Sequence, residues 1–407
     1  MKAFERLLNY ITYETQACGT ENQESVPSSP GQTVFAKALM EELKNFGVKD
    51  VIMDEKGFIY GTVPSNMDKK TPVVGFIAHM DTATTFPGPG NTARLIRNYD
   101  GTVIQLCEDV SMDPSDFPGL KASIGNDLIV TNGKTLLGGD DKAGLAEIMT
   151  AIEYMMEHPE FKHGQVAFIF TPDEEIGGST KHIDLTKSSA EIAYTLDGEG
   201  FGTVEYQNFC KGAFTVQIHG ISAHPCYAKN LMKNALIVAA ELHSMMPPWQ
   251  RPEHTEGFDG YYHLVQIEGN PQEAKMAYLL NFHTIDEYEE RKTFVKHIVD
   301  FLNNKYGDNT IELEFIDGKM CVEDLIEARM ELIDYAKEEI AKCGQIPEVI
   351  PMRGGTDGVA LTAMGLPCPN LGTGSYNHHS VHEFANIQEM DLCVEMILGL
   401  IRRFGEQ

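Results

Sequence analysis

Hydrophobic residues follow two alternating patterns in the first half of the chain. Segment 33–47, TVFAKALMEELKNFG, repeats apolar residues at helical spacing and ends in glycine, so a helix is predicted there. Segments 73–81, 165–175 and 192–200 are short apolar runs, which are typical of buried strands, and a helical segment, 143–157, separates the first two. Strands that alternate with helices predict an α/β fold, with a mixed, mostly parallel sheet flanked by helices. We expect its functional groups at the carboxyl ends of the strands.

A different pattern begins about halfway along the chain. Residues 213–222 alternate strictly between apolar and polar positions, which predicts a strand. A helix is predicted next, with its apolar side formed by Leu231, Ala235, Val238 and Leu242. Two adjacent strands follow at 262–269 and 275–286, then a charged helix at 287–305 and a final strand at 310–317. This order, β-α-β-β-α-β, is the ferredoxin-like arrangement.

The α/β pattern then resumes and continues to residue 407. We therefore predict a catalytic domain in two parts, 1–210 and 319–407, with a small α+β domain, 211–318, inserted between them. A chain of 407 residues is long enough to give each of the two domains its own core.

Composition narrows the class of protein. The formal net charge of −28 disfavours nucleic acids and anionic membranes as partners. No apolar run is long enough to span a membrane, and the first 16 residues lack the apolar core and cleavage site of a signal peptide. The eight cysteines include no CxxC pair, which indicates thiols in a reducing compartment rather than a disulfide framework. A cytoplasmic protein is expected.

Residues that bind metals in proteins stand at four predicted strand ends or loops and in one C-terminal stretch. The first four places contain His79, Asp81, Asp140, Asp141, Glu174, Glu175 and Asp197, and the stretch GTGSYNHHSVHEF adds His378, His379 and His382. Taken singly, an aspartate at a strand end is more often a cap or turn residue. Together, imidazoles and carboxylates at successive strand ends form the type of ligand set that Zn²⁺ prefers.

Three acids are crowded at the end of one predicted strand, in the sequence VAFIFTPDEEIGG. Asp173, Glu174 and Glu175 would raise one another's pKa unless cations neutralise them, and a pair of metal ions would do so. Only one of the two adjacent glutamates can readily coordinate a metal. The other is then free to act as a base toward a water molecule.

Seven motifs stand in the order and spacing of a known family. They are AHMDT, GGDDKAG, FTPDEEIGG, TLDGEG, AHPCYAKNLMKNA, MRGGTDG and YNHHSVHEF. Through almost its whole length the chain resembles the peptidase T family, the tripeptide aminopeptidases of a larger dizinc family that also holds aminoacylases and glutamate carboxypeptidases. The resemblance implies a metallo-aminopeptidase that removes the N-terminal residue from short peptides, with an inserted lid domain.

The resemblance also implies a role for each ligand. His79 and Asp197 would bind one zinc ion, Glu175 and His379 would bind the other, and Asp140 would bridge them. Two Zn²⁺ per subunit are therefore expected, with cobalt or manganese as substitutes.

Further roles follow from the same resemblance. Asp81 would orient the imidazole of His79, Glu174 would be the general base, and the bond between Asp140 and Asp141 would be cis. The family pattern Tyr-Asn-x-His selects His379 over its neighbour His378, and His382 is given a structural role.

Two more residues resemble substrate contacts. Arg353 would bind a substrate carboxylate through two hydrogen bonds, and the alternative is that it forms only a surface ion pair. His224 of the lid would stabilise the oxyanion that forms at the scissile carbonyl. The lid departs from the family at Cys226 and Asn230, where glycines are usual, and at Asn281, where peptidase T carries an arginine. Discrimination of peptide length is therefore expected to be weaker.

Other functions are compatible with parts of the pattern. A carboxypeptidase or an N-acyl amino acid deacylase could use the same two metals, and a free amine on the substrate would distinguish these from an aminopeptidase. An inactive binding protein is disfavoured because Glu174 and all the ligands are present. A nucleotide-binding protein is disfavoured because GGDDKAG is too acidic to cradle phosphate. Short peptides are the expected partners, and a homodimer formed through the lid domain is a further expectation.

Overall fold

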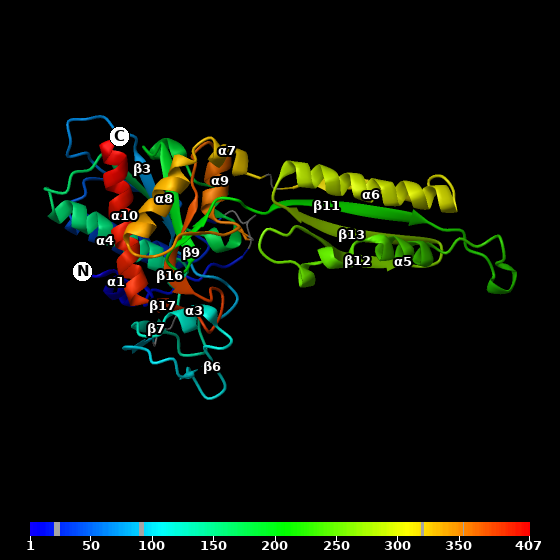
Figure 1. The fold of residues 1–407 in the computed structure, drawn as a ribbon, viewed down its shortest axis with the longest axis horizontal. Helices are drawn as coiled ribbons and strands as arrows, with labels where there is room; N and C mark the ends of the chain where they lie inside the picture. The colour runs from blue at the N-terminus through cyan, green and yellow to red at the C-terminus, as the bar shows by residue number, and fades with distance from the viewer. Residues whose placement is uncertain (20–24, 89–92, 319–320, 353) are drawn as a thin grey trace. The chain divides into compact units, whose positions relative to one another are not determined.

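The computed structural model describes residues 1–407 except 20–24, 89–92, 319–320 and 353. The chain divides into two compact units (Figure 1). Unit 1 comprises Met1–Tyr206, Leu325–Ile350 and Thr356–Gln407, and unit 2 comprises Gln207–Asp324 with Pro351–Gly355. Within the described ranges, no helix is long and apolar enough to cross a membrane.

Unit 1 is built on a large mixed sheet with the strand order β1-β2-β8-β3-β9-β16-β17-β7-β4. The bounds are β1 (Asp50–Met53), β2 (Ile59–Val63), β3 (Val74–His79), β4 (Arg94–Ile96), β7 (Leu128–Val130), β8 (Val166–Thr171), β9 (Ile192–Glu199), β16 (Asn370–Tyr376) and β17 (Phe384–Asn386). The four central strands β8, β3, β9 and β16 pair in parallel, and antiparallel strands flank them on both sides. The predicted mixed α/β fold is confirmed.

Short strands complete unit 1. β10 (Thr203–Glu205) and β15 (Glu348–Val349) join the large sheet beside β16, while β5 (Ile104–Gln105) and β6 (Ser111–Met112) form a separate ribbon. The helices are α1 (Ala3–Tyr10), α2 (Pro30–Asn45), α3 (Pro118–Ala122), α4 (Gly139–Glu157), α8 (Glu331–Lys342), α9 (Asp357–Ala363) and α10 (Ile387–Glu406), and α7 (Glu323–Glu327) lies where the two units join along the chain.

The central strands are buried on both faces, which explains their nearly continuous apolar sequences. Along β3, Phe76 and Ala78 pack into the core formed with α1, α2, α4, α8 and α10, while Ile77 packs into a second core on the opposite face. β8 repeats the alternation, with Phe168 in the first core and Ile169 in the second. Because both faces of these central strands are covered, polar groups can gather only at the ends of the strands.

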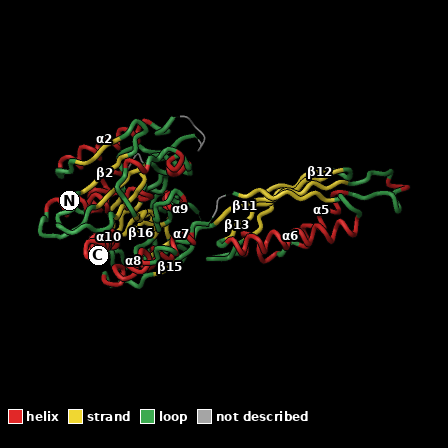
Figure 2. The backbone as a smooth tube through the Cα atoms, turned by 90° about the horizontal axis from the view of Figure 1, so that it is seen from above, coloured by secondary structure: helices red, strands yellow, loops and turns green. Residues whose placement is uncertain are grey.

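Unit 2 contains a four-stranded antiparallel sheet with the order β12-β13-β11-β14 (Figure 2). Its strands are β11 (Cys210–His219), β12 (Tyr261–Gly269), β13 (Glu273–Phe282) and β14 (Ile311–Asp317), and its helices are α5 (Ala235–Met245) and α6 (Ile285–Tyr306). Both helices pack on the sheet around one apolar core. The predicted ferredoxin-like order is confirmed.

Two details of unit 2 differ from the sequence prediction. The first helix begins at Ala235, because the Asn234 side chain caps it by accepting the N–H of Leu236, and Leu231 lies exposed in the preceding loop. Cys210 and Cys321 form a disulfide with their Cα atoms 4.9 Å apart, so the expectation of thiols alone is wrong for this pair. The pairing of β11 with β14 brings these two cysteines together, and the other six cysteines are free.

Candidate metal centre

The candidate ligands of unit 1 come from the ends of neighbouring elements. His79 is the last residue of β3, Asp197 lies on the adjacent parallel strand β9, and Glu175 follows β8 on the other side of β3. Asp140 lies at the start of α4, and His379 follows β16. Parallel strands end at the same edge of a sheet, so this topology gathers the side chains there.

Asp140 occupies the middle of the cluster. Its Oδ1 lies 2.9 Å from Nε2 of His79, and its Oδ2 lies 3.1 Å from Nε2 of His379. Oδ1 of Asp197 lies 3.5 Å from Nε2 of His79. Oε2 of Glu175 lies 2.9 Å from Nε2 of His379. One carboxylate therefore faces two groups of ligand atoms with a different oxygen toward each.

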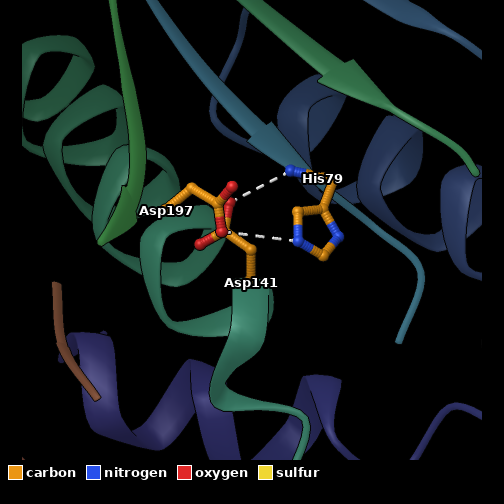
Figure 3. Close-up of side chains that lie close together, drawn as sticks. All are labelled: His79, Asp141 and Asp197. Carbon is orange, nitrogen blue, oxygen red and sulfur yellow. Dashed lines mark hydrogen bonds and ion pairs between the residues drawn. The ribbon is translucent and has the colours of Figure 1, made fainter. Parts of the chain in front are cut away.

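Asp141 is the rival for the central position. His79, Asp141 and Asp197 form one group whose ligand atoms all lie within 4.8 Å of one another (Figure 3). His79, Asp140 and Glu175 form a second such group. However, Oδ2 of Asp141 accepts the backbone N–H of His79 at 3.0 Å, so this oxygen is already engaged by the main chain. The Asp140–Asp141 peptide bond is cis, as expected.

Asp81 connects the histidine to the two glutamates. This fully buried carboxylate accepts the backbone N–H of Glu174 at 3.0 Å and that of Glu175 at 3.1 Å, one with each oxygen. Its Oδ1 also lies 3.4 Å from Nδ1 of His79. Asp81 thus faces the ring nitrogen that points away from Asp140, as an orienting acid would.

The short turn that carries the two glutamates is held on one side through Asp173 and on the other by Asp357, which the sequence analysis did not single out. Asp173, at φ 58°, accepts hydrogen bonds from the backbone and hydroxyl of Ser28 and from the Gln32 amide. Asp357 accepts hydrogen bonds from the hydroxyls of Thr171 and Ser179, which lie on either side of the turn. The MRGGTDG motif contains Asp357, so its place in a polar motif was the available signal.

The crowded acids perturb one another strongly. Burial, followed by the charge of Asp140, raises the pKa of Glu175 to about 7, and burial raises the pKa of Asp197 to about 6. Burial also raises the pKa of Glu174 well above its usual value, with Asp197 adding to the effect. Hydrogen bonds to Asp140 and Glu175 raise the pKa of His379 to about 11. The cluster thus attracts positive charge.

The residues present fit divalent cations. The donors are imidazole nitrogens and carboxylate oxygens, the set that suits zinc and similar metals. In addition, Oε1 of Glu175 is buried and has no hydrogen-bond partner among the described residues. A buried carboxylate oxygen without a partner is costly, and a cation would remove that cost.

The remaining histidines of the C-terminal segment have other contacts. His378 has Nε2 2.7 Å from the Ser375 hydroxyl, and its Nδ1 is 3.5 Å from Oδ2 of Asp140, farther than His379 lies. His382 has Nδ1 3.1 Å from the hydroxyl of Ser380 and packs against an aromatic ring.

Of the two predicted substrate contacts, one belongs to unit 2 and the other lies outside the described residues. His224 belongs to unit 2, where its Nδ1 accepts the backbone N–H of Cys226 at 3.3 Å. Asn281 is buried on β13, opposite Lys211 of β11. Arg353 lies outside the described residues.

Comparisons with known proteins identify a matching family and similar structures. The model of peptidase family M20/M25/M40 matches residues 135–403. Peptidase T of Caldanaerobacter subterraneus subsp. tengcongensis is 43% identical, over 100% of this chain and 99% of that protein. The crystal structure of aminopeptidase PepT from Bacillus cereus superposes with a TM-score of 0.71 at 22% identity, covering 98% of each chain. A dinuclear metal-binding peptidase of Bacillus subtilis from the M20 family superposes with a TM-score of 0.62 at 13% identity, covering 99% of each chain.

Proposed function

Since the chain belongs to peptidase family M20/M25/M40 and, within it, to peptidase T, we propose that it is a dizinc aminopeptidase that removes the N-terminal residue from tripeptides and other short peptides. The family membership makes it a peptidase. The observation that carries the metal part of the proposal is the position of Asp140, with one oxygen toward His79 and the other toward His379.

In this proposal five residues would hold the two cations. His79 and Asp197 would bind the first, Glu175 and His379 the second, and Asp140 both. When bound, two cations would polarise the scissile carbonyl and lower the pKa of a water molecule from about 16 toward about 7.

The protein's own groups would move the proton. Glu174 accepts a proton from the attacking water at its carboxylate and returns it to the leaving amine. Burial raises the pKa of Glu174, which favours the return of the proton to the amine. Asp81 holds the backbone of Glu174 and Glu175 with two hydrogen bonds, and this fixes the base relative to His79.

Unit 2 would act as a lid that supplies substrate contacts. The resemblance of its motifs supports His224 as a donor to the oxyanion and Arg353 as the partner of the substrate's C-terminal carboxylate. A homodimer formed through this unit and a cytoplasmic location stay predictions.

A panel of substrates tests the proposed function. The purified protein, supplied with Zn²⁺, is assayed on trialanine, N-acetyl-trialanine, C-amidated trialanine and N-acetyl-alanine, and the products are identified by mass spectrometry. Release of N-terminal alanine from trialanine, with no cleavage of the acetylated peptide, is the expected result. Cleavage of acetylated substrates alone would show a deacylase or carboxypeptidase and would overturn the proposal.

A further inference from the structure

Glu383 is a buried carboxylate with an unusual set of partners. It is 1% exposed and lies immediately before β17. Its Oε2 accepts the backbone N–H of Leu137 at 2.7 Å and that of Gly138 at 2.9 Å, and its Oε1 accepts the N–H of Asp140 at 2.9 Å. Three main-chain donors of one loop are therefore bound by a single side chain that lies far away in the sequence.

Those donors need an acceptor because the backbone is irregular there. The first N–H groups of a helix lack partners within the helix. Gly138 has a left-handed φ of 78°, and Asp140 has a ψ of 105°, so neither continues the regular hydrogen bonding of α4. A Cβ atom at Gly139 would lie 3.1 Å from Oε1 of Glu383, so the second glycine of GGDDKAG gives the carboxylate room to approach.

The segment that carries Glu383 also carries a candidate ligand. His379 lies four residues earlier, and the intervening loop is fixed by the Thr131 hydroxyl, which donates to the carbonyl of Val381 at 2.5 Å. The Asn377 amide donates to the carbonyl of His382 at 3.0 Å. Glu383 thus links the loop that carries His379 to the loop that carries Asp140.

We propose that Glu383 is a positioning residue, which fixes the main chain at Asp140 so that the two carboxylate oxygens face the two groups of ligand atoms. The inference rests on the proposed metal centre. It assigns to Glu383 a contribution to metal affinity that a carboxylate stabilising only the fold would not make.

A matched pair of variants tests the inference. Glu383→Gln keeps the size of the side chain but turns an N–H₂ group toward backbone N–H donors. Glu389→Gln is the control, because Glu389 is a partly buried carboxylate that also accepts three hydrogen bonds. They come from the Phe201 backbone, the Tyr376 hydroxyl and the Asn386 amide rather than from a candidate ligand. Both variants are measured without metal by thermal unfolding and with Zn²⁺ by competition against a chelator.

The two readouts separate positioning from general stability. We expect Glu383→Gln to bind Zn²⁺ about 10- to 100-fold more weakly than the wild type, the usual effect of removing a group that orients metal ligands. Glu389→Gln should lower the melting temperature of the metal-free protein while the Zn²⁺ affinity stays unchanged. Wild-type Zn²⁺ affinity in Glu383→Gln would overturn the inference, whereas a wild-type protein that binds no Zn²⁺ would overturn the metal centre itself.

A milder variant keeps the inference testable if Glu383→Gln does not fold. Gly139→Ala places a methyl group 3.1 Å from Oε1 of Glu383, so this oxygen has to shift by a few tenths of an ångström from its present position against the N–H of Asp140. A loss of Zn²⁺ affinity in the same direction, about several-fold, supports the inference. An unchanged affinity in a folded Gly139→Ala protein overturns it.

Discussion

Replacement of the proposed base, Glu174→Gln, should abolish most of the turnover while both metals stay bound. The amide cannot accept the proton, but the backbone N–H of residue 174 would still donate to Asp81 at 3.0 Å, so the turn keeps its anchor. The neighbouring acids cannot easily take over the role. Asp357 is engaged by the hydroxyls of Thr171 and Ser179, and Glu175 is engaged by His379.

The expected loss of turnover is therefore the full loss that follows from removing a general base. Removing such a group costs about 10²- to 10⁴-fold in rate, which corresponds to about 2.7 to 5.5 kcal/mol of barrier. The assay compares kcat for trialanine in the wild type and in Glu174→Gln, with metal content measured on the same samples by plasma mass spectrometry. A variant with full metal content and a kcat within about threefold of the wild type would refute the role of Glu174.

Three further predictions concern the bridge, the core and specificity. Asp140→Ala should lose metal from both positions, whereas two metals per chain in that variant, measured after dialysis, would move the bridge to Asp141. Burial raises the pKa of Glu147 well above its usual value, so its contribution to stability is present below about pH 4.5 and is lost as the pH rises toward the folded-state pKa. In urea unfolding, Glu147→Gln should therefore gain stability over the wild type as the pH rises above about 4.5, by up to about 1.4 kcal/mol per pH unit, and a pH-independent difference would contradict this. Because Asn281 cannot supply a charge, dialanine and tetra-alanine should be cleaved with a kcat/KM within about tenfold of that for trialanine, and strict tripeptide selectivity would refute this role of Asn281. Amidation of the C-terminus should lower kcat/KM about ten- to a hundredfold, because the amide removes the charge that Arg353 would bind.

The fold was predictable where local pattern and tertiary structure agree. β3, β8 and β9 are buried on both faces and therefore have nearly continuous apolar sequences, and the candidate ligands His79, Glu175 and Asp197 stand at or near their ends. The ferredoxin-like order was readable from alternation in the strands of unit 2. The start of α5 could not be read in this way, because the spacing of Leu231 fits a helix, whereas the Asn234 cap makes the helix begin at Ala235.

Features that depend on distant partners escaped the sequence analysis. The disulfide joins Cys210 to Cys321 across 111 residues, and only the pairing of β11 with β14 brings them together. Glu383 looks like an ordinary acid in the sequence, because its three donors lie more than 240 residues away. Asp357 is similar, since Thr171 and Ser179 reach it only in the folded chain. The candidate metal ligands could be picked out from the sequence more readily than the residues that position them.

A crystal structure of the zinc-loaded protein, with anomalous diffraction recorded at the zinc edge, tests the central claim most directly. Two anomalous peaks are expected about 3.5 to 4 Å apart, with one oxygen of Asp140 bound to each ion. His79 and Asp197 should complete the first site, and Glu175 and His379 the second. A single peak, or two peaks bridged by a residue other than Asp140, would contradict a two-metal centre in which Asp140 is the bridge.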